Sequence, residues 1–229
     1  MVCTLNDPMA GMIMNVASGR RGTYKPGRIR DRNLESIIYA AEKEFVKNGF
    51  RGTTIQTIAD RAGLPKSNVH YYFGSKEKLY LAVLNDIMAI WNEQLGLIDD
   101  NDDPAVALDR FIQEKIRLSF AYPDASKLFA MEIISGAPYL RPFLQVELRK
   151  FASSRAKIIQ KWIDKGLMRN VDPMQLIFLI WSSTQHYADF DVQVLSLMKK
   201  QKYSDHMIRD ISRGVRDMIL TGCGLSLPS

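Results

Sequence analysis

The chain has 229 residues, of which 46% are hydrophobic and 24% charged, and a formal net charge of +6, which fits one large or two modest globular domains. Its two cysteines, Cys3 and Cys223, are too few and too peripheral for a disulfide framework and indicate a reducing compartment. The longest wholly apolar run, Leu176–Trp181, is far too short to span a membrane, and residues 1–14 lack the basic start of a signal peptide, so we expect a cytoplasmic protein.

The positive charge is concentrated toward the N-terminus. Up to Tyr80 the chain has 13 lysines and arginines against 7 aspartates and glutamates, whereas from Leu81 onward it has 18 of each. Binding of nucleic-acid phosphates needs such a localised basic region, because each neutralised phosphate releases condensed counterions. The charge distribution therefore favours a nucleic-acid contact in the N-terminal part of the chain.

Residues 1–27 show no hydrophobic periodicity and are rich in Gly, Ser, Asn and Met, which predicts a flexible basic tail. Two interpretations stay open for its cations. They either form an arm that lies along a DNA backbone or in the minor groove, or they belong to an unstructured extension. The cations of the tail and of the segment that follows are Arg20, Arg21, Lys25, Arg28, Arg30 and Arg32.

The first predicted helix runs from about Ile29 to Asn48, and Gly49 is its stop signal. One face of this helix is apolar, which suits a support for the elements that follow. The apolar positions are Leu34, Ile38, Ala41 and Phe45.

The stretch Thr53–Lys78, with the sequence TTIQTIADRAGLPKSNVHYYFGSKEK, predicts two short helices joined by a tight turn. Thr53 or Thr54 supplies the N-cap oxygen of the first helix, and Gly63 ends it because glycine tolerates positive φ. Pro65 presets the backbone for the second helix, which extends to about residue 73. Two helices of this size around a glycine turn form a helix-turn-helix unit, whose second helix enters the DNA major groove.

The exposed face of the second short helix is rich in hydrogen-bond donors and free of acidic residues, while Val69 and Phe73 are its buried positions. The alternative is a merely structural helix pair, because glycine-turned pairs are common. We expect contacts to base edges from Lys66, Ser67, Asn68 and His70, and contacts to phosphates from Thr53 or Thr54, Tyr71, Tyr72, Ser75, Lys76 and Lys78.

A further helix is predicted to begin after Ser75 and to reach about Leu97. Ser75 is its N-cap, and the free N–H groups of a helix N-terminus with lysines beside them attract anions. This helix is long enough to belong to both halves of the molecule, so movement of its far end would rotate its near end against the phosphates. Its apolar positions are Leu79, Val83, Ile87 and Trp91.

These residues resemble the DNA-binding domain of TetR-type bacterial regulators. The family pattern is present as Gly49-Phe50, Thr53-Thr54, Ile58-Ala59, Ala62-Gly63, Tyr72-Phe73 and Ser75-Lys76-Glu77. The chain departs from the commonest family residues at Pro65, Ser67, Asn68 and His70, which concerns the operator sequence rather than the fold. The resemblance implies a transcriptional regulator that binds a double-stranded DNA operator.

The second half of the chain also predicts helices, each with its own start and stop signals. An acidic loop at 99–103 precedes them, and no strand-type alternation or hairpin turn competes, so we expect an all-α protein. The domains we expect are the tail over 1–27, the helix-turn-helix domain over 28–80, and an effector-binding and dimerisation domain over 81–229. The predicted helices run from Asp103-Pro104 to about Ala121, from Pro123 to Ser135, from Pro138 to Lys165, from Asp172-Pro173 to Phe190, and from Ser204 to Gly222.

Within the helix after Asp172, the apolar run Leu176–Trp181 is followed by the polar run Ser182–His186. If this helix is buried all round, some of these polar groups point inward and need partners. Two interpretations stay open. In one, Ser182 and Ser183 are small residues that let helices approach, and Gln185 or His186 bonds across a dimer interface. In the other, Trp181, Thr184 and Gln185 line a pocket for a small planar polar molecule.

The last helix carries an apolar stripe that could pack inside the chain or across a two-fold axis. Helix-turn-helix readers usually need two half-sites in register, so we expect a homodimer. The residues we expect at the dimer interface are Ile177, Met207, Ile211, Val215 and Met218.

A narrower resemblance, to the pyrimidine-utilisation repressors within the TetR family, rests on residues 128–132, 136–138 and especially 181–190 (WSSTQHYADF). It implies a homodimer paired through the last two helices. It also implies a sensor pocket for a uracil- or thymine-like ring, whose occupation releases DNA. The effector-binding residues it implies are Phe129, Glu132, Trp181, Thr184, Gln185 and Tyr187.

Catalysis has little support in the sequence. His70, His186 and His206 are scattered without metal-ligand spacing, and there is no phosphate-cradling glycine loop or nucleophile elbow. We therefore expect no enzyme, no metal and no cofactor. The alternatives are an all-α ligand-binding protein or enzyme without DNA binding, and an architectural DNA protein without sequence preference.

Overall fold

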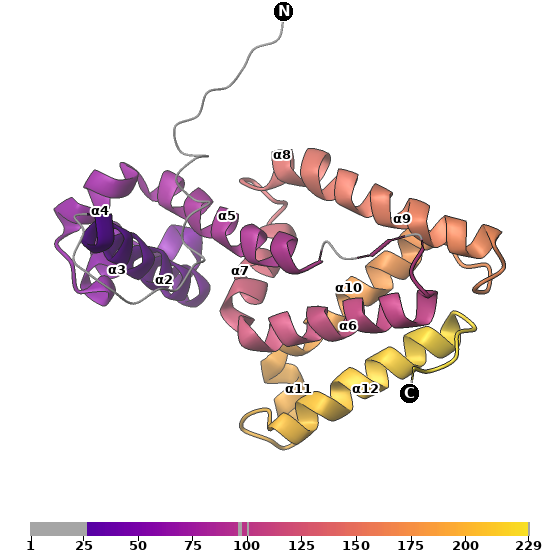
Figure 1. The fold of residues 1–229 in the computed structure, drawn as a ribbon. Coiled ribbons are helices and arrows are strands. Elements are labelled where there is room, and N and C mark those ends of the chain that lie inside the picture. The colour runs from indigo at the N-terminus through magenta and orange to yellow at the C-terminus, as the bar shows by residue number, and fades with distance from the viewer. Residues whose placement is uncertain (1–26, 96–97, 100, 229) are drawn as a thin grey trace, which may run out of the picture. The chain divides into compact units, whose positions relative to one another are not determined.

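The computed structural model describes residues 27–95, 98–99 and 101–228, and these form helices joined by turns, with no strand among them (Figure 1). The predicted all-α fold class is confirmed. The predicted tail lies, apart from Gly27, outside the described residues and stays a prediction.

Contacts divide the chain into two compact units, with the division between Asp86 and Ile87. Helix α5, Lys76–Leu95, crosses this division and contributes its N-terminal part to the first unit and its C-terminal part to the second. The domain boundary predicted after residue 80 lies on the same helix.

The first unit is built from α2 (Gly27–Gly52), α3 (Ile55–Ala62), α4 (Lys66–Phe73) and the start of α5. α3 packs against both α2 and α4. Tyr80 of α5 joins the aromatic side chains of α2, with ring centroids 4.8 Å from Phe45 and 5.0 Å from Phe50. The side chains buried in this unit include Ile37, Ala41, Phe45, Ile58, Ala59, Val69 and Leu79.

Helix α2 does not end at Gly49, as predicted, but kinks there and continues to Gly52. The Gly49 backbone has φ 67° and ψ 172°, a conformation that glycine adopts without the steric cost of a Cβ atom. The helical φ and ψ angles are therefore interrupted at the expected residue, whereas the helix continues for about one more turn, to Gly52.

In the second unit, α10 contacts α6, α7, α9, α11 and α12, and α12 also lies alongside α6 (Figure 1). The fully buried Trp162 is the largest side chain of its core. Besides the end of α5, the elements of this unit are α6 (Pro104–Ala121), α7 (Pro123–Ile134), α8 (Arg141–Phe143), the π-helical η1 (Leu144–Leu148), α9 (Arg149–Asp164), α10 (Pro173–Asp189), α11 (Asp191–Leu197) and α12 (Asp205–Gly222).

Two predictions for the second unit are corrected. The helix expected from Pro138 is interrupted, because Ala137 at φ 53° belongs to a turn and helical structure starts only at Arg141, just before Pro142. Hydrogen bonds then widen to the π pattern over η1 before regular α-helix resumes. The short helix α11 was not predicted, because a segment of this length is too short for apolar periodicity to show.

Candidate nucleic-acid interface and ligand cavity

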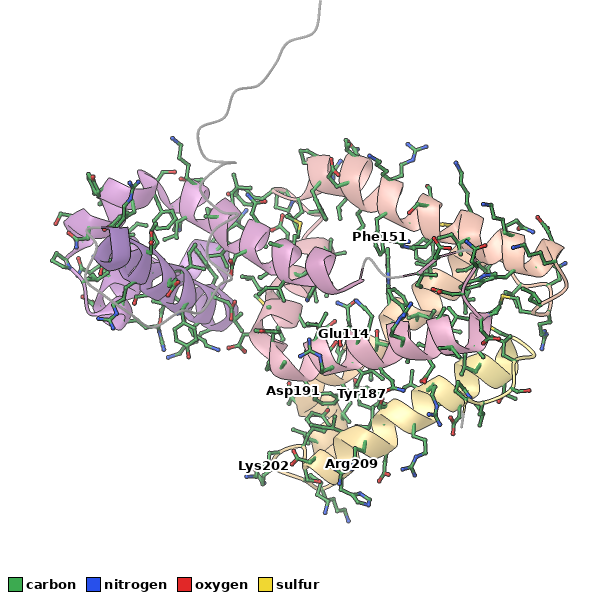
Figure 2. The ribbon with its side chains drawn as sticks, viewed as in Figure 1. Glu114, Phe151, Tyr187, Asp191, Lys202 and Arg209 are labelled. Atoms are coloured by element: carbon green, nitrogen blue, oxygen red, sulfur yellow. The ribbon has the colours of Figure 1, made fainter. Side chains whose placement is uncertain are left out.

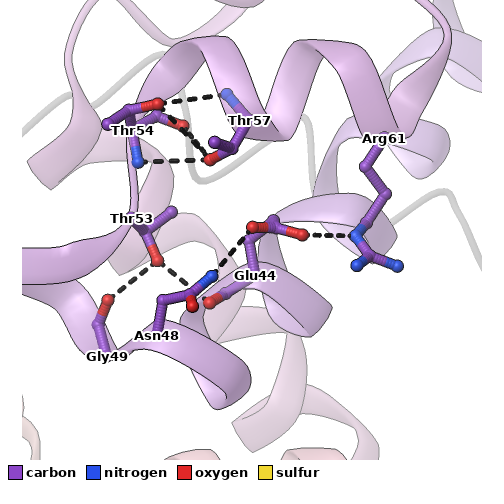
Figure 3. Close-up of polar contacts among 7 residues, drawn as sticks. All are labelled: Glu44, Asn48, Gly49, Thr53, Thr54, Thr57 and Arg61. Atoms are coloured by element: carbon purple, nitrogen blue, oxygen red, sulfur yellow. Dashed lines mark hydrogen bonds and ion pairs between the residues drawn. The ribbon is translucent and has the colours of Figure 1, made fainter.

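Helix α3 is fixed at both ends by local chemistry. Thr54 Oγ1 accepts a hydrogen bond from Thr57 N at 3.1 Å, and Thr57 Oγ1 accepts one from Thr54 N at 3.3 Å, which forms a capping box (Figure 3). At the other end Gly63 adopts the left-handed conformation, with φ 66° and ψ 30°. These caps set the direction in which the chain leaves α3 and enters α4.

Thr53 is buried, and its hydroxyl faces the main chain of α2. Its Oγ1 atom lies 2.9 Å from the Glu44 carbonyl oxygen and 2.8 Å from that of Gly49 (Figure 3). Of the two alternatives predicted for a phosphate contact, Thr53 or Thr54, this placement favours Thr54, because the Thr53 side chain binds backbone carbonyls inside the unit. The adjacent Thr54 is exposed and has the N-cap role.

A carboxylate joins α2 to α3. Glu44 is 7% exposed, and its Oε1 accepts a hydrogen bond from Arg61 Nε at 2.6 Å, while its Oε2 accepts one from Asn48 Nδ2 at 3.0 Å (Figure 3). The charge-assisted contact is short, and its carboxylate is shielded from water, which strengthens it relative to a surface pair. Arg61 is thereby directed toward α2.

The face of α4 that the sequence predicted to read DNA is at the surface. Tyr71 is 79% exposed and packs edge-on against Tyr72, with ring centroids 5.2 Å apart. Tyr72 is half-buried, and its hydroxyl accepts a hydrogen bond from Asn33 Nδ2 at 3.4 Å. Exposed alongside Tyr71 are Lys66, Ser67 and His70, with Asn68 half-buried, while Val69 and Phe73 pack inward.

The start of α5 is less cationic than predicted. Ser75 Oγ accepts a hydrogen bond from Lys78 N at 3.2 Å, which confirms the predicted N-cap. The Glu77 carboxyl has a pKa below its ordinary value, because it accepts hydrogen bonds from its own backbone N–H and from the Ser75 hydroxyl. An ionised carboxylate therefore shares this helix N-terminus with any phosphate that binds there.

Lys76 is half-buried, unlike the exposed Lys66 and Lys78. Its Nζ atom donates hydrogen bonds to the carbonyl oxygens of Phe50 at 2.8 Å and Thr53 at 2.9 Å. The ammonium group of Lys76, which was predicted to contact a phosphate, is thus bonded to main-chain carbonyls within the unit. Sequence reasoning also missed Thr57, whose spacing from Thr54 in a T-x-x-T pattern was the available signal.

The second unit contains a cavity of about 50 Å³ with an aromatic lining. This exceeds the roughly 10–15 Å³ that one water molecule needs. Trp91 and Phe129 meet edge-on in its wall with ring centroids 4.8 Å apart, and Phe151 extends from α9 (Figure 2). The lining residues are Met88, Trp91, Lys115, Phe129, Phe143, Leu148, Phe151, Trp181 and Gln185.

Lys115 of α6 is the charged group of this cavity. It is 6% exposed, its Nζ donates a hydrogen bond to Gln185 Oε1 at 3.1 Å, and it lies 5.3 Å from the centre of the Trp91 ring. Burial lowers the pKa of Lys115 to about 8, and the charge of Asp189 opposes this shift. Burial also raises the pKa of Asp189, even though Ser126 Oγ donates to that carboxylate at 2.5 Å. Both groups therefore shift toward their neutral forms.

The structure brings together half of the predicted effector-binding residues. Phe129, Trp181 and Gln185 line the cavity, whereas Thr184 is buried with its hydroxyl donating to the Ile180 carbonyl at 2.6 Å. Glu132 is buried too, and its Oε1 accepts hydrogen bonds from the backbone N–H groups of residues 139 and 140.

Tyr187 of α10 is labelled in Figure 2. Its ring centroid lies 6.5 Å from that of Phe120, and it is not part of the cavity lining. Glu132, Thr184 and Tyr187 therefore lie outside the cavity lining, and their predicted effector-binding roles stay predictions. Lys115, which the sequence analysis missed, occupies a buried position of an amphipathic helix, and a lysine at such a position was the available signal.

The residues predicted at the dimer interface fall into two groups. Ile177 and Val215 are 2% and 3% exposed within the core of a single chain, so they have almost no surface to offer a partner. Met207 and Ile211 are half-buried and Met218 is 70% exposed. On α10 the exposed apolar residues are instead Phe178 and Leu179.

The described residues form neither a cluster of metal-binding side chains nor a membrane-spanning helix. No group of three or more His, Cys, Asp or Glu side chains there is placed to hold a metal ion. No helix in the same part of the chain combines the length and apolar character needed to cross a membrane.

Comparisons with known proteins follow the division of the fold. Residues 37–83 match the family described as bacterial regulatory proteins, tetR family, and residues 84–226 match the YcdC-like protein, C-terminal region. The HTH-type transcriptional regulator RutR of Escherichia coli is 37% identical over 200 residues, which cover 87% of this chain and 94% of RutR. The HTH-type transcriptional repressor NicS of Pseudomonas putida is 29% identical over 81% of this chain and 93% of NicS.

Among solved structures, AibR in complex with isovaleryl coenzyme A and operator DNA has the same fold. It superposes with a TM-score of 0.65 at 20% sequence identity, over 81% of this chain and 97% of the AibR chain.

Proposed function

Because the chain belongs to the tetR family of bacterial regulatory proteins, we propose that this DNA-binding transcriptional regulator is a homodimeric repressor released from its operator by a small planar effector. The observation that carries the effector part is the buried Lys115–Gln185 pair in an aromatic cavity. Each part of the proposal has separate physical support.

DNA reading is proposed for the exposed face of α4. Lys66, Ser67, Asn68 and His70 supply side-chain donors for base edges, and the caps of α3 and α5 orient this helix. Phosphate contacts are proposed for the exposed or half-buried hydroxyl and ammonium groups around it. The exposed ones belong to Thr54, Thr57, Tyr71 and Lys78, and the half-buried ones to Tyr72 and Ser75.

The effector is proposed to be a pyrimidine such as uracil or thymine. Lys115 has three N–H donors and gives one to Gln185, so donors remain for a carbonyl oxygen of the ligand, and the amide nitrogen of Gln185 adds another. The rings of Trp91, Phe129 and Trp181 offer apolar faces to a flat heterocycle. The resemblance at residues 181–190 supports the same ligand class.

The homodimer is proposed to pack through α10 and α12. Phe178 and Leu179 are 53% and 52% exposed on α10, and Met218 is exposed on α12, although large apolar side chains are usually buried. Met207, Ile211 and Met218 recur at i, i+4 and i+11 on α12, which places them on one stripe. Leu179→Asp should therefore shift the molecular mass measured by light scattering from dimer to monomer, while Gln193→Leu on α11 should not.

Release of DNA is proposed to be a population shift. The dimer is proposed to have two forms, one that fits the operator and one that does not. The effector favours the second form only to the extent that it binds that form more tightly than the first. α5 is the proposed connection, because its C-terminal part supplies Met88 and Trp91 to the cavity and its N-terminal end carries Ser75 and Lys78.

The test uses a duplex that the protein itself selects from a randomised library. Thermal shift is measured with uracil, thymine and purine bases, since a ligand that binds only the folded state raises the melting temperature. We expect a pyrimidine to raise it and to release the duplex in a gel shift. Lys115→Met and Gln185→Leu should abolish both effects, and the exposed Gln193→Leu should abolish neither.

The outcomes separate the parts of the proposal. If another metabolite releases the duplex and no pyrimidine does, the effector assignment is wrong, but the proposal of an effector-released repressor is supported. If the protein binds all duplexes equally and ignores small molecules, it is an architectural DNA protein.

A further inference from the structure

The connection between α2 and α3 in the first unit is held by a lysine from a distant part of the chain. Lys76 lies at the start of α5, 26 residues after Phe50 and 23 after Thr53. Its Nζ donates to both of their carbonyl oxygens, at 2.8 and 2.9 Å, and lies 4.5 Å from the centre of the Phe50 ring. Charge-assisted hydrogen bonds and a cation–π contact thus act on one ammonium group.

The carbonyl groups that Lys76 binds belong to the last turn of α2, beyond the kink, and to the connection that follows it. Helical geometry breaks at Gly49, and residues 53 and 54 separate the end of α2 from α3. Carbonyls at the end of a helix lack intrahelical donors and need partners from elsewhere. Lys76 supplies two such donors, and the Thr53 hydroxyl supplies one to the carbonyls of Glu44 and Gly49 (Figure 3).

The hydrogen bond from Lys76 to the Thr53 carbonyl affects the N-cap of α3, because the two are linked by a single peptide group. The Thr53 carbonyl and the Thr54 N–H belong to the same planar peptide group, so fixing one orients the other. Thr54 N donates to Thr57 Oγ1 within the capping box of α3. Lys76 therefore fixes the residue whose cap directs α3 and, beyond Gly63, α4.

We propose that Lys76 is a positioning residue for DNA recognition, which joins the start of α5 to the α2–α3 connection instead of neutralising a phosphate. This inference rests on the DNA-binding role stated above. It assigns different tasks to neighbouring lysines: Lys78 is exposed and available to a phosphate, while Lys76 is half-buried and bonded to the main chain.

The dependence of DNA affinity on salt distinguishes the two tasks. A lysine that neutralises one phosphate adds about 0.9 to the slope of log K against log salt concentration, and a residue that touches no phosphate adds nothing. The proposed measurement compares the wild-type chain, Lys76→Met and Lys78→Gln over a potassium chloride series. The probes are a duplex that the wild-type chain selects from a randomised library and a scrambled duplex of equal length.

For Lys76→Met we expect affinity for the selected duplex to fall roughly ten-fold or more, because a misplaced α4 loses contacts to base edges. Its salt slope and its affinity for the scrambled duplex should stay at the wild-type values. For Lys78→Gln we expect the slope to fall by about 0.9 on both duplexes. A slope reduced by Lys76→Met as much as by Lys78→Gln, or an unchanged affinity for the selected duplex, would overturn the proposal.

Phe50→Leu provides a second test that leaves every charge in place, and it decides the matter if Lys76→Met does not fold. Removing the ring frees one side of the ammonium group, so we expect weaker binding to the selected duplex at an unchanged slope. Unchanged affinity with Phe50→Leu would reject a positioning role. Binding of the selected duplex by the wild-type chain tests the DNA-binding function separately, so the two failures cannot be confused.

Discussion

Lys115→Met should make the second unit more stable near neutral pH and less stable in alkali. Burial lowers the pKa of Lys115 from the 10.5 of a free lysine to about 8. At about 1.4 kcal/mol for each pH unit, the buried charge costs about 3 kcal/mol below pH 8. Methionine removes this cost, but it also removes the contacts with Gln185 and Trp91, worth about 1–2 kcal/mol together. The expected net gain near pH 7 is about 1–2 kcal/mol.

The sign of this difference should reverse as the pH rises. Between the folded pKa of about 8 and the unfolded pKa of 10.5, the unfolded chain binds more protons at Lys115 than the folded chain does. Stability of the wild-type chain therefore rises with pH across this window, whereas Lys115→Met has no such contribution. Near pH 10 the wild-type chain should be the more stable by less than about 1 kcal/mol, because the hydrogen bond to Gln185 remains while the folded chain no longer carries most of the charge.

Tryptophan fluorescence is the suitable assay, since all three tryptophans (Trp91, Trp162 and Trp181) belong to the second unit. Urea unfolding of both proteins at about pH 7 and about pH 10 gives the four free energies. The exposed Lys157→Met on α9 serves as control and should follow the wild-type chain at both pH values. Parallel pH dependence in the wild-type chain and Lys115→Met would refute the reasoning, because Lys115 would then not titrate in this window.

Three further substitutions test the framework of each unit. Glu44→Gln removes the charge that Arg61 binds at 2.6 Å, so circular dichroism should show a first unit less stable by about 1 kcal/mol, with Glu42→Gln as the milder control. Gly63→Ala forces a Cβ atom into a backbone with φ 66°. This should lower the stability of the first unit by about 1–2 kcal/mol, also followed by circular dichroism, and weaken DNA binding. Trp162→Ala should cost about 3–5 kcal/mol, whereas Trp162→Phe should cost clearly less, because the buried Nε1 of Trp162 finds no acceptor among the described residues. Urea unfolding followed by circular dichroism distinguishes the two tryptophan variants.

Local chemistry predicted most of the fold. The predicted N-caps at Ser75, Asp103, Asp172 and Ser204 are confirmed. In each of them the capping side chain accepts a hydrogen bond from the backbone N–H three residues later. Helix α3 and helix α4 also have the expected positions, because the glycine and proline between them act on the backbone directly. Such signals are read within one turn of the chain, so tertiary structure rarely overrides them.

The site was less predictable, because its roles depend on contacts between distant residues. Thr53 and Thr54 are equivalent as sequence, and only the packing of α2 makes one a buried support and the other an exposed cap. Gln185 was predicted to line a pocket, but Lys115 is 70 residues away in the chain, so the sequence could not show that the two side chains meet there. Ile177 and Val215 fit an apolar stripe that periodicity alone cannot assign to a core or to an interface.

Net charge overstates the cations available to DNA in the described part of the first unit. Arg61 is bound to Glu44, Lys76 to two carbonyls, and the Glu77 carboxylate accompanies Lys78 at the start of α5. If Lys66 and Lys78 were the phosphate-binding cations, the salt slope would be about 2 per subunit. A clearly steeper slope would have to come from the cations that precede α3, among them those of the predicted tail.

Deleting residues 1–24 isolates the tail's share, because it removes Arg20 and Arg21 and leaves every described residue in place. If both arginines lie against phosphates, the slope should fall by about 2 per subunit, at a cost in affinity that grows as the salt concentration falls. If the tail is idle, wild-type and shortened chains should give the same slope on the selected and the scrambled duplex. Recognition would then rest on the hydrogen-bond donors of α4, and the excess charge of the tail would have no part in holding the operator.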